Sequence, residues 1–289
     1  MNVTQSARYR RRQLFRAVEM LYVQAAVWTV PRYPDFMCIG APRAATTWLH
    51  QALREHPGVF LPKRKEIHFY DEPPPAGYLN GDMRWADAHI FDVERPGHLR
   101  WYWRQFRHAG DRLTGDITPL YSTLSAERIA VIRRHQPDLR IIYILRNPVE
   151  RAWSGLRKSV WYQKGPTYLD QQGEQWVLEQ LMHPSVLQRG DYQTAIDRWE
   201  SVFPAAQILY LFHDDIRADA NRELRQVLEH LGLQAAPQLD RGAERRQVNA
   251  APPMAIPDAA RSALEAHYRE QIPWLEKKFG RDLSHWVTR

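Results

Sequence analysis

Short apolar segments alternate with segments of helical periodicity along most of this chain, and this alternation limits the fold more than any other feature. The apolar run at residues 36–40 comes just before the helical pattern at 46–56, and residues 140–145 come just before 148–162. Each pair has the order of a strand and the crossover helix that leads to a parallel neighbour. Further predicted strands lie at 112–117 and 207–212, and further predicted helices lie at 126–135, 220–231 and 257–279. The sequence therefore predicts an α/β fold with a central parallel sheet flanked by helices.

The domain organisation is expected to change near residue 30. Residues 1–30 are expected to form an N-terminal basic amphipathic helix, because residues 8–28 combine apolar positions at helical spacing with a cluster of arginines. Two interpretations stay open: the helix packs on the protein, or it makes a peripheral contact with a membrane surface. Residues 31–289 are expected to form a single domain, because a chain of this length suits one sizeable core.

The net charge favours an anionic ligand. Lysine and arginine outnumber aspartate and glutamate by 40 to 33, which gives a net charge of +7. Composition alone leaves nucleic acid, a membrane surface and a small molecule with phosphate or sulfate groups open. The lone Cys38 excludes an internal disulfide, so a cytoplasmic protein is expected. Because His, Asp and Glu residues lack zinc-like spacing, no metal is expected.

The connection at residues 40–47 has the position of an anion-binding loop. It reads Gly-Ala-Pro-Arg-Ala-Ala-Thr-Thr between an apolar run and a predicted helix. Backbone N–H groups at a helix N-terminus bind phosphate or sulfate, and Arg43 adds a positive charge beside them. A nucleotide-hydrolysing P-loop would carry Gly and Lys where Ala45 and Thr46 stand, which disfavours a kinase or an ATPase. An ordinary strand-to-helix connection is the alternative that the loop alone leaves open.

Three segments in this order resemble the sulfotransferases that use 3′-phosphoadenosine 5′-phosphosulfate (PAPS). The loop at 40–47 resembles the phosphosulfate-binding motif of that family. Residues 63–71, Lys-Arg-Lys-Glu-Ile-His-Phe-Tyr-Asp, look like the acidic motif of its carbohydrate, heparan sulfate-type members. Residues 143–154 are similar to the motif that clasps the ribose phosphate of the donor. The resemblance implies a P-loop-like three-layer fold, an enzyme, and PAPS as the sulfuryl donor.

The resemblance also implies which residues bind the donor. The phosphosulfate is assigned to the loop residues Arg43, Ala44, Ala45, Thr46 and Thr47. The ribose phosphate is assigned to Arg146 and Ser154, and an arginine fork suits bidentate phosphate contacts. A structural ion pair is the alternative for Arg146 taken alone. Residues 245–249 resemble the basic loop that closes over the nucleotide, which implies Arg245 and Arg246 as further donor ligands.

The catalytic base implied by the resemblance is Glu66, which takes the proton of the acceptor as its oxygen attacks sulfur. His68, two residues later, is expected on the same face of a strand, where it assists or orients Glu66. Arg43 and the loop amides are expected to stabilise the charge of the leaving phosphate. From the residues alone, Glu66 could instead be a surface carboxylate paired with Lys63 or Lys65, and His68 a structural residue.

Two departures from the family pattern lie in the loop. Arg43 stands where many members carry Lys, and Ala44 and Ala45 stand where Gly is common. The positive charge is kept, but a rigid guanidinium replaces a flexible ammonium group. Residues 115–121 resemble a strand-end motif near the acceptor cleft of the family.

Two other functions compete with the sulfotransferase. A nucleotide kinase shares the fold and an anion loop, but the lysine of that loop is missing here. A non-enzymatic protein that binds nucleic acid or a membrane surface would use the basic charge, but it has no need for Glu66 beside a basic loop. The sequence therefore favours transfer to a hydroxyl group of a carbohydrate or small metabolite, with no nucleic-acid partner. Transfer to nitrogen and the oligomeric state stay open.

Overall fold

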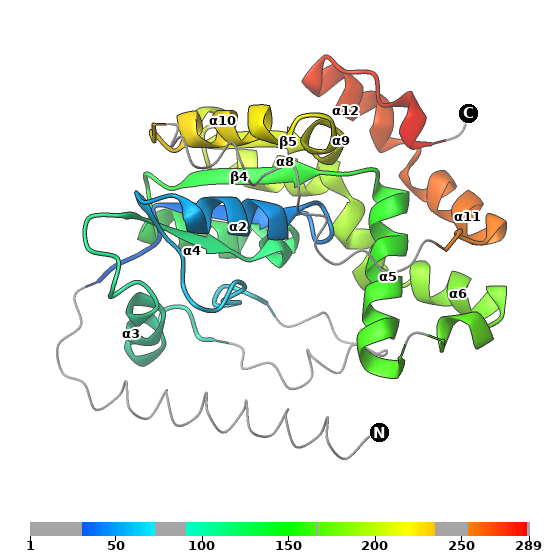
Figure 1. Ribbon diagram of the computed structural model, residues 1–289, viewed down its shortest axis with the longest axis horizontal. Helices are drawn as coiled ribbons and strands as arrows, with labels where there is room; N and C mark the ends of the chain where they lie inside the picture. Colours follow the sequence, from blue (N-terminus) through cyan, green and yellow to red (C-terminus); the bar gives the residue numbers. More distant parts are fainter. Residues whose placement is uncertain (1–30, 73–90, 166, 235–253, 288–289) are drawn as a thin grey trace.

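A sheet of five parallel strands in the order β2-β3-β1-β4-β5 forms the centre of the protein (Figure 1). The structure is a computed structural model and describes residues 31–72, 91–165, 167–234 and 254–287. The strands are β1 (Phe36–Gly40), β2 (Val59–Phe60), β3 (Leu113–Ile117), β4 (Arg140–Leu145) and β5 (Ile208–Phe212). Helices flank the sheet, so the predicted α/β class is confirmed. The predicted helix at 8–28 lies outside the described residues.

The helices connect and cover the strands (Figure 1). They are α2 (Thr46–Glu55), α3 (Pro96–Arg104), α4 (Ala126–His135), α5 (Pro148–Lys164), α6 (Glu174–Leu181), α7 (Pro184–Leu187), α8 (Tyr192–Glu200), α9 (His213–Ala218), α10 (Ala220–His230), α11 (Asp258–Tyr268) and α12 (Gln271–Phe279). The helical pattern predicted at 257–279 is confirmed, and two helices, α11 and α12, form it. Pro273 cannot continue a helix through the preceding turn, because its ring clashes with the carbonyl four residues earlier. Among the helices in the described ranges, none is long and apolar enough to cross a membrane.

The core has two parts. The larger hydrophobic cluster surrounds the sheet, in which every residue of β1 is buried and only Arg140 of β4 is exposed. A second cluster joins α5, α6 and α11 and includes Val149, Val177 and Leu264. Central strands with both faces covered read as unbroken apolar runs, which explains why β1 and β4 were predictable. The single domain expected at 31–289 stays a prediction.

The carboxyl ends of all five strands lie at one edge of the sheet, because the strands are parallel. The connection after β1 leads to α2, and the connection after β4 leads to α5. The first turn of α5 is well defined, since Asn147 Oδ1 accepts from the amides of Val149 and Glu150 at 2.9 and 3.2 Å. The edge therefore gathers the loop, the start of α5 and the motif that follows β3.

Gly115 in β3 allows a close approach between strands. A Cβ atom at this position would lie 2.1 Å from Cζ of Phe36 in β1. We therefore expect Gly115→Ala to lower the free energy of unfolding by about 1–3 kcal/mol, the usual range for overpacking. Chemical denaturation measures the change, with Gly173→Ala as the control, because an added Cβ there meets nothing within 4 Å. Equal losses in the two variants would contradict the close packing.

Candidate active site

The connection at residues 40–47 leaves the N-terminus of α2 available to an anion. The loop turns tightly, since the amide of Ala44 donates to the carbonyl of Ala41 at 3.1 Å. Arg43 and Ala45 adopt left-handed backbone conformations, with φ of 72° and 62°. Among the described residues, no side chain caps α2, and its first turn contains no acidic residue. The amides of this turn and the positive end of the helix dipole therefore form a site that suits phosphate or sulfate.

Two arginines and a serine from three segments meet at this loop. Arg43 Nε donates to Ser154 Oγ at 3.1 Å, which joins the loop to α5. Arg146 follows β4 directly and donates from Nη1 to the carbonyl of Arg43 at 2.8 Å. Burial lowers the pKa of Arg146. Within the described part of the chain, no ion pair joins its guanidinium to a carboxylate, so the alternative of a structural ion pair finds no partner there.

Residues 63–71, which we call the acidic segment, form an irregular loop. The strand before them, β2 (Val59–Phe60), contains only two residues and is followed by Pro62, which has no N–H to donate to a sheet. His68 has φ of 59°, which is incompatible with a pleated strand. The expectation that Glu66 and His68 share a strand face is therefore wrong, although their side chains do meet.

A chain of polar contacts connects the acidic segment to the loop. Lys65 Nζ donates to Thr46 Oγ1 at 3.3 Å and to Glu66 Oε1 at 2.8 Å. His68 Nε2 lies 3.4 Å from Glu66 Oε2, and His68 Nδ1 lies 2.6 Å from Asp71 Oδ2. Glu66 thus lies between a lysine that touches the anion loop and a histidine that is held by a second carboxylate. The predicted pairing of Glu66 with Lys65 occurs. Because Lys65 also contacts Thr46, the pair connects Glu66 to the anion loop.

The charges of Glu66 and His68 support each other. Burial opposes the charged form of Glu66, but hydrogen bonds from His68 and Lys65 outweigh it and lower the pKa of Glu66 to about 2. Burial likewise opposes the charged imidazolium of His68, but hydrogen bonds to Asp71 and Glu66 raise its pKa to about 9. Near neutral pH, Glu66 is therefore ionised and His68 is protonated.

The titration of His68 is expected to differ from that of an ordinary histidine. It should titrate near pH 9, whereas burial lowers the pKa of His50 to about 4. Because its pKa is raised from 6.5, His68 contributes stability that is complete below pH 6.5 and is lost as the pH rises through 9. NMR titration of the ring Cε1–H signals checks this, with His68→Gln to assign the resonance. A signal that titrates near 6.5 would contradict the ion pair with Glu66 and Asp71.

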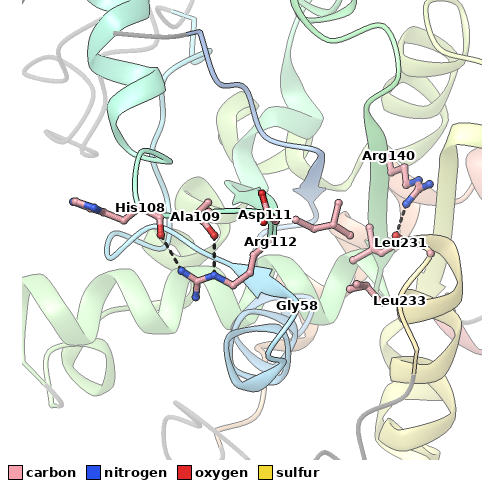
Figure 2. A pocket seen from close by; sticks show the side chains of 11 residues that line it. Gly58, His108, Ala109, Asp111, Arg112, Arg140, Leu231 and Leu233 are labelled. Atoms are coloured by element: carbon pink, nitrogen blue, oxygen red, sulfur yellow. Dashed lines mark hydrogen bonds between the residues drawn. The ribbon is translucent and has the colours of Figure 1, made fainter. Parts of the chain in front are cut away.

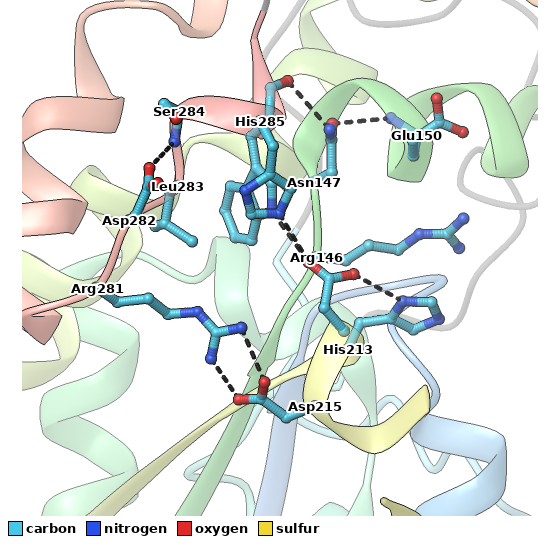
Figure 3. Close-up of polar contacts among 12 residues, drawn as sticks. Arg146, Asn147, Glu150, His213, Asp215, Arg281, Asp282, Leu283, Ser284 and His285 are labelled. Carbon is cyan, nitrogen blue, oxygen red and sulfur yellow. Dashed lines mark hydrogen bonds and ion pairs between the residues drawn. The ribbon is translucent and has the colours of Figure 1, made fainter. Parts of the chain in front are cut away.

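The carboxyl-terminal residues 281–287 lie against the end of β4 (Figure 3). Asn147 Nδ2 donates to the carbonyl of Trp286 at 3.0 Å. Next to this contact lies a cavity of about 460 Å³, whose lining includes Asn147, Arg261 and Trp286. The contact fixes the backbone next to Arg146, so the position of Arg146 depends on residues near the end of the chain.

Two aspartates at the start of α9 hold the same carboxyl-terminal residues (Figure 3). Asp214 accepts from Trp286 Nε1 at 3.1 Å, and Arg281 Nη2 donates to Asp215 at 2.8 Å. A hydrogen bond from His213 lowers the pKa of Asp214, and burial lowers the pKa of His213. None of these residues was predicted from the sequence. Their position directly after the predicted strand at 207–212 was a signal for them, since that strand ends at the same edge as the loop.

A larger cavity of about 790 Å³ lies at the other edge of the sheet (Figure 2). Its lining includes Arg140, the first residue of β4, and Arg112 and Leu113 at the start of β3. Arg112 donates to the carbonyls of Ala109 and His108, both at 2.9 Å, and Arg140 donates to the carbonyl of Leu231. These arginines bind nearby backbone carbonyls. The cavity lies at the amino ends of the strands, so the length of the strands separates it from the 40–47 loop at their carboxyl ends.

The structure brings most of the predicted site residues to one edge of the sheet. The loop at 40–47 contains Arg43, Ala44, Ala45, Thr46 and Thr47. Glu66, His68, Arg146 and Ser154 come from other segments and are connected to it by the contacts described above. Arg245 and Arg246 lie outside the described residues. The roles of all these residues stay predictions.

Comparison with known proteins agrees with this geometry. Residues 34–237 match the Sulfotransferase family. Human heparan sulfate glucosamine 3-O-sulfotransferase 6 is 25% identical over 204 residues, which cover 70% of this chain and 53% of the relative. The chain spans about half or less of the length of the first curated relatives that it matches.

Solved structures share the fold. A sulfotransferase from Alicyclobacillus acidocaldarius has a TM-score of 0.66 at 22% identity, with 88% of this chain and 99% of that chain covered. The mouse sulfotransferase SULT7A1, in a complex with PAP (3′-phosphoadenosine 5′-phosphate, the desulfated donor), has a TM-score of 0.52 at 16% identity. The match covers 86% of this chain and 89% of that chain. The match to the family model over residues 34–237 agrees with the five-stranded parallel sheet and with the anion loop. The chain therefore belongs to the sulfotransferase family.

Proposed function

We propose that the protein transfers the sulfuryl group of PAPS to a hydroxyl group of a carbohydrate or small metabolite and releases PAP. The observation that carries the proposal is the meeting of Arg43, Arg146 and Ser154 at the uncapped N-terminus of α2. The PAP complex of the mouse relative supports the donor. The distant similarity to a human heparan sulfate 3-O-sulfotransferase supports a carbohydrate hydroxyl as the acceptor.

The residues fit a donor that carries two anionic groups. The first-turn amides of α2 and Arg43 suit the phosphosulfate, because a helix N-terminus and a guanidinium both bind tetrahedral anions. Arg146 and Ser154 suit the ribose phosphate. A guanidinium has five N–H groups, so the bond from Arg146 to the carbonyl of Arg43 leaves donors for a phosphate. When bound, PAPS supplies an activated sulfuryl group, and the charge that develops on the departing phosphate is stabilised by these donors.

Glu66 accepts the proton of the acceptor hydroxyl in this proposal. It is ionised near neutral pH, as a proton acceptor must be, but a pKa of about 2 makes it a weak base while it is paired with Lys65 and His68. Lys65 contacts both Glu66 and Thr46. A shift of the Lys65 ammonium towards an anion in the loop would remove one of the contacts that lower the pKa of Glu66. Binding of the donor would thereby strengthen the base.

His68 orients Glu66 and does not act as the base. A base must be unprotonated in the resting enzyme, whereas contacts with Asp71 and Glu66 raise the pKa of His68 to about 9. Its Nδ1 contact with Asp71 fixes the ring, and its Nε2 contact holds one oxygen of Glu66. Sulfuryl transfer then depends on positioning and on electrostatic stabilisation by the chain's own residues.

Calorimetric titration of the purified protein tests the donor class. We expect PAP to bind and ATP with magnesium to give little response, because the loop has Thr46 where an ATP-binding loop carries Lys. ATP is the matched ligand, since it shares the adenosine and lacks the 3′-phosphate. Failure of PAP to bind, or a preference for ATP, would contradict the proposed function.

A further inference from the structure

A buried carboxylate in β3 lies behind the acidic segment. Asp116 has no exposed surface. Its Oδ2 accepts from the hydroxyls of Tyr102 and Tyr121, both at 3.0 Å, and its Oδ1 accepts from Thr118 Oγ1 at 2.6 Å. In the described ranges, no ion pair joins Asp116 to a cation. Three hydroxyl groups therefore stabilise this charge.

Two of these hydroxyls also hold the backbone of the acidic segment. Thr118 Oγ1 accepts from the amide of Ile67 at 3.0 Å. The hydroxyl of Tyr121 accepts from the amides of Phe69 and Tyr70 at 3.0 and 3.4 Å. The amides on both sides of His68 are thus fixed, and Ile67 follows Glu66 directly in the chain. Tyr102 differs from Tyr121, since it contacts the same oxygen of Asp116 without accepting from these amides.

The ionised carboxylate determines how these hydroxyls point. A carboxylate can only accept hydrogen bonds, so Thr118 and Tyr121 must turn their single protons towards Asp116. Their lone pairs are then directed to accept from the amides of the acidic segment. A neutral side chain at position 116 would not impose this order, and the two hydroxyls could turn their protons away. The charge of Asp116 thereby acts on the acidic segment without touching it.

Burial of this charge opposes stability. Burial raises the pKa of Asp116 to about 6, even though hydrogen bonds from Thr118, Tyr102 and Tyr121 favour its ionised form. A buried carboxylate without a paired cation is expensive, and such groups are often kept where function requires them. Asp116 orients two hydroxyls that hold the acidic segment, and this explains why a buried carboxylate stands here.

We propose that Asp116 is a positioning residue that holds Glu66 in place through the hydroxyls of Thr118 and Tyr121. The inference rests on the proposed role of Glu66 as the base. It adds a function for the motif at residues 115–121, which links the end of β3 to the acidic segment. Substitutions in this link should affect the acidic segment and leave the donor loop unchanged.

A matched pair of tyrosine variants tests the link. Tyr102→Phe and Tyr121→Phe each remove one donor to Asp116 Oδ2, but only Tyr121→Phe also removes the acceptor for the amides of Phe69 and Tyr70. NMR titration of His68 reports on the acidic segment without donor or acceptor. We expect Tyr121→Phe to shift the pKa of His68 from about 9 towards 6.5, and Tyr102→Phe to leave it nearly unchanged.

Turnover provides the second readout, measured as PAP released from PAPS with the carbohydrate acceptor that gives the highest wild-type rate. Tyr121→Phe should lower kcat by about tenfold or more, because small displacements of a catalytic group have large effects on rate. The KM for PAPS and the affinity for PAP should stay within about twofold, since the donor contacts are intact. Tyr102→Phe should retain at least about half of the wild-type kcat.

Position 118 provides a rescue experiment. Thr118→Val keeps the shape and removes the hydroxyl, so it should act like Tyr121→Phe, whereas Thr118→Ser keeps the hydroxyl and should restore both the His68 titration and kcat. Asp116→Asn should also act like Tyr121→Phe, because its amide cannot accept from all three hydroxyls.

Equal effects of the two tyrosine variants, or a Thr118→Ser protein that behaves like Thr118→Val, would overturn the proposal and leave these residues as ordinary core contacts. If a tyrosine variant fails to fold, the comparison of Thr118→Ser with Thr118→Val still tests whether the hydroxyl at position 118 is required. Failure of the wild type to bind PAP would contradict the proposed function instead, while the His68 titration would still test the link to Asp116.

Discussion

Glu66→Gln is expected to lower turnover by about 10²- to 10⁴-fold, the usual contribution of a general base. The glutamine is close in size and can still accept from Lys65, but it cannot take up a proton. The loop and Arg146 are untouched, so the affinity for PAP should change by less than about twofold. Turnover is measured as PAP released from PAPS, and PAP affinity is measured by calorimetry. The expected split between rate and binding separates loss of the base from loss of the donor site.

Glu94→Gln is the control for this experiment. Glu94 forms an ion pair with Arg134 at 2.6 Å, and both side chains are more than half exposed. The control therefore removes a paired carboxylate far from the loop in the sequence, and its turnover should equal that of the wild type. A Glu66→Gln protein with wild-type turnover would show that the base is another group.

Arg146→Ala is expected to weaken PAP binding by about 10- to 100-fold, because a hydrogen bond between charged groups contributes about 1.5–3 kcal/mol. The substitution also removes the bond to the carbonyl of Arg43, so part of the loss would come from the loop. Arg146→Lys keeps the charge without the fork and should give an intermediate affinity. Calorimetric titration with PAP measures all three proteins.

The control for Arg146 lies at the other end of the same strand. Arg140 begins β4 and donates to the carbonyl of Leu231, so Arg140→Ala also removes an arginine that binds a backbone carbonyl. It lies at the edge away from the loop, and its PAP affinity should equal that of the wild type. Similar losses from Arg140→Ala and Arg146→Ala would point to a general loss of structure and would contradict a direct contact with the nucleotide.

The central strands could be predicted from the sequence because they are buried on both faces. Residues 36–40 and 140–145 match β1 and β4 in every residue. β2 could not be predicted, since a strand of two residues has no periodicity. α3 begins with Pro96 and Gly97, a pair that indicates a turn, so the sequence did not predict a helix there.

The candidate site was predictable where one short segment carries a whole motif. The loop and the residues after β4 are of this kind, and the structure places Arg43, Arg146 and Ser154 together. The contacts that hold the site were not predictable, because they join distant parts of the chain. Thr118 and Ile67 are 51 residues apart, and Asp214 and Trp286 are 72 residues apart. A single sequence contains no signal for such pairs.

The left-handed conformation of Ala45 is not one that its local sequence favours. An L-residue in this conformation costs about 1–2 kcal/mol, and glycine would avoid most of the cost. Propensity alone would therefore not place an alanine with φ of 62° at the start of α2. The residue is held by the helix, since the carbonyl of Ala45 accepts from the amide of Leu49 at 3.2 Å.

The helix α5 packs in the second core cluster and also contacts the loop through Ser154, and this makes nucleotide binding and folding interdependent. Ser154 on α5 meets the loop, while Val149 and Val160 pack in the second cluster with α6 and α11. A ligand that binds only the folded protein adds about 2.7 kcal/mol of stability at a concentration 100 times its Kd. PAP bound at the loop would therefore raise the melting temperature of the second cluster as well. Conversely, loosening the packing of α11 would appear in solution as a lower affinity for the nucleotide, through thermodynamic linkage and without any contact to it.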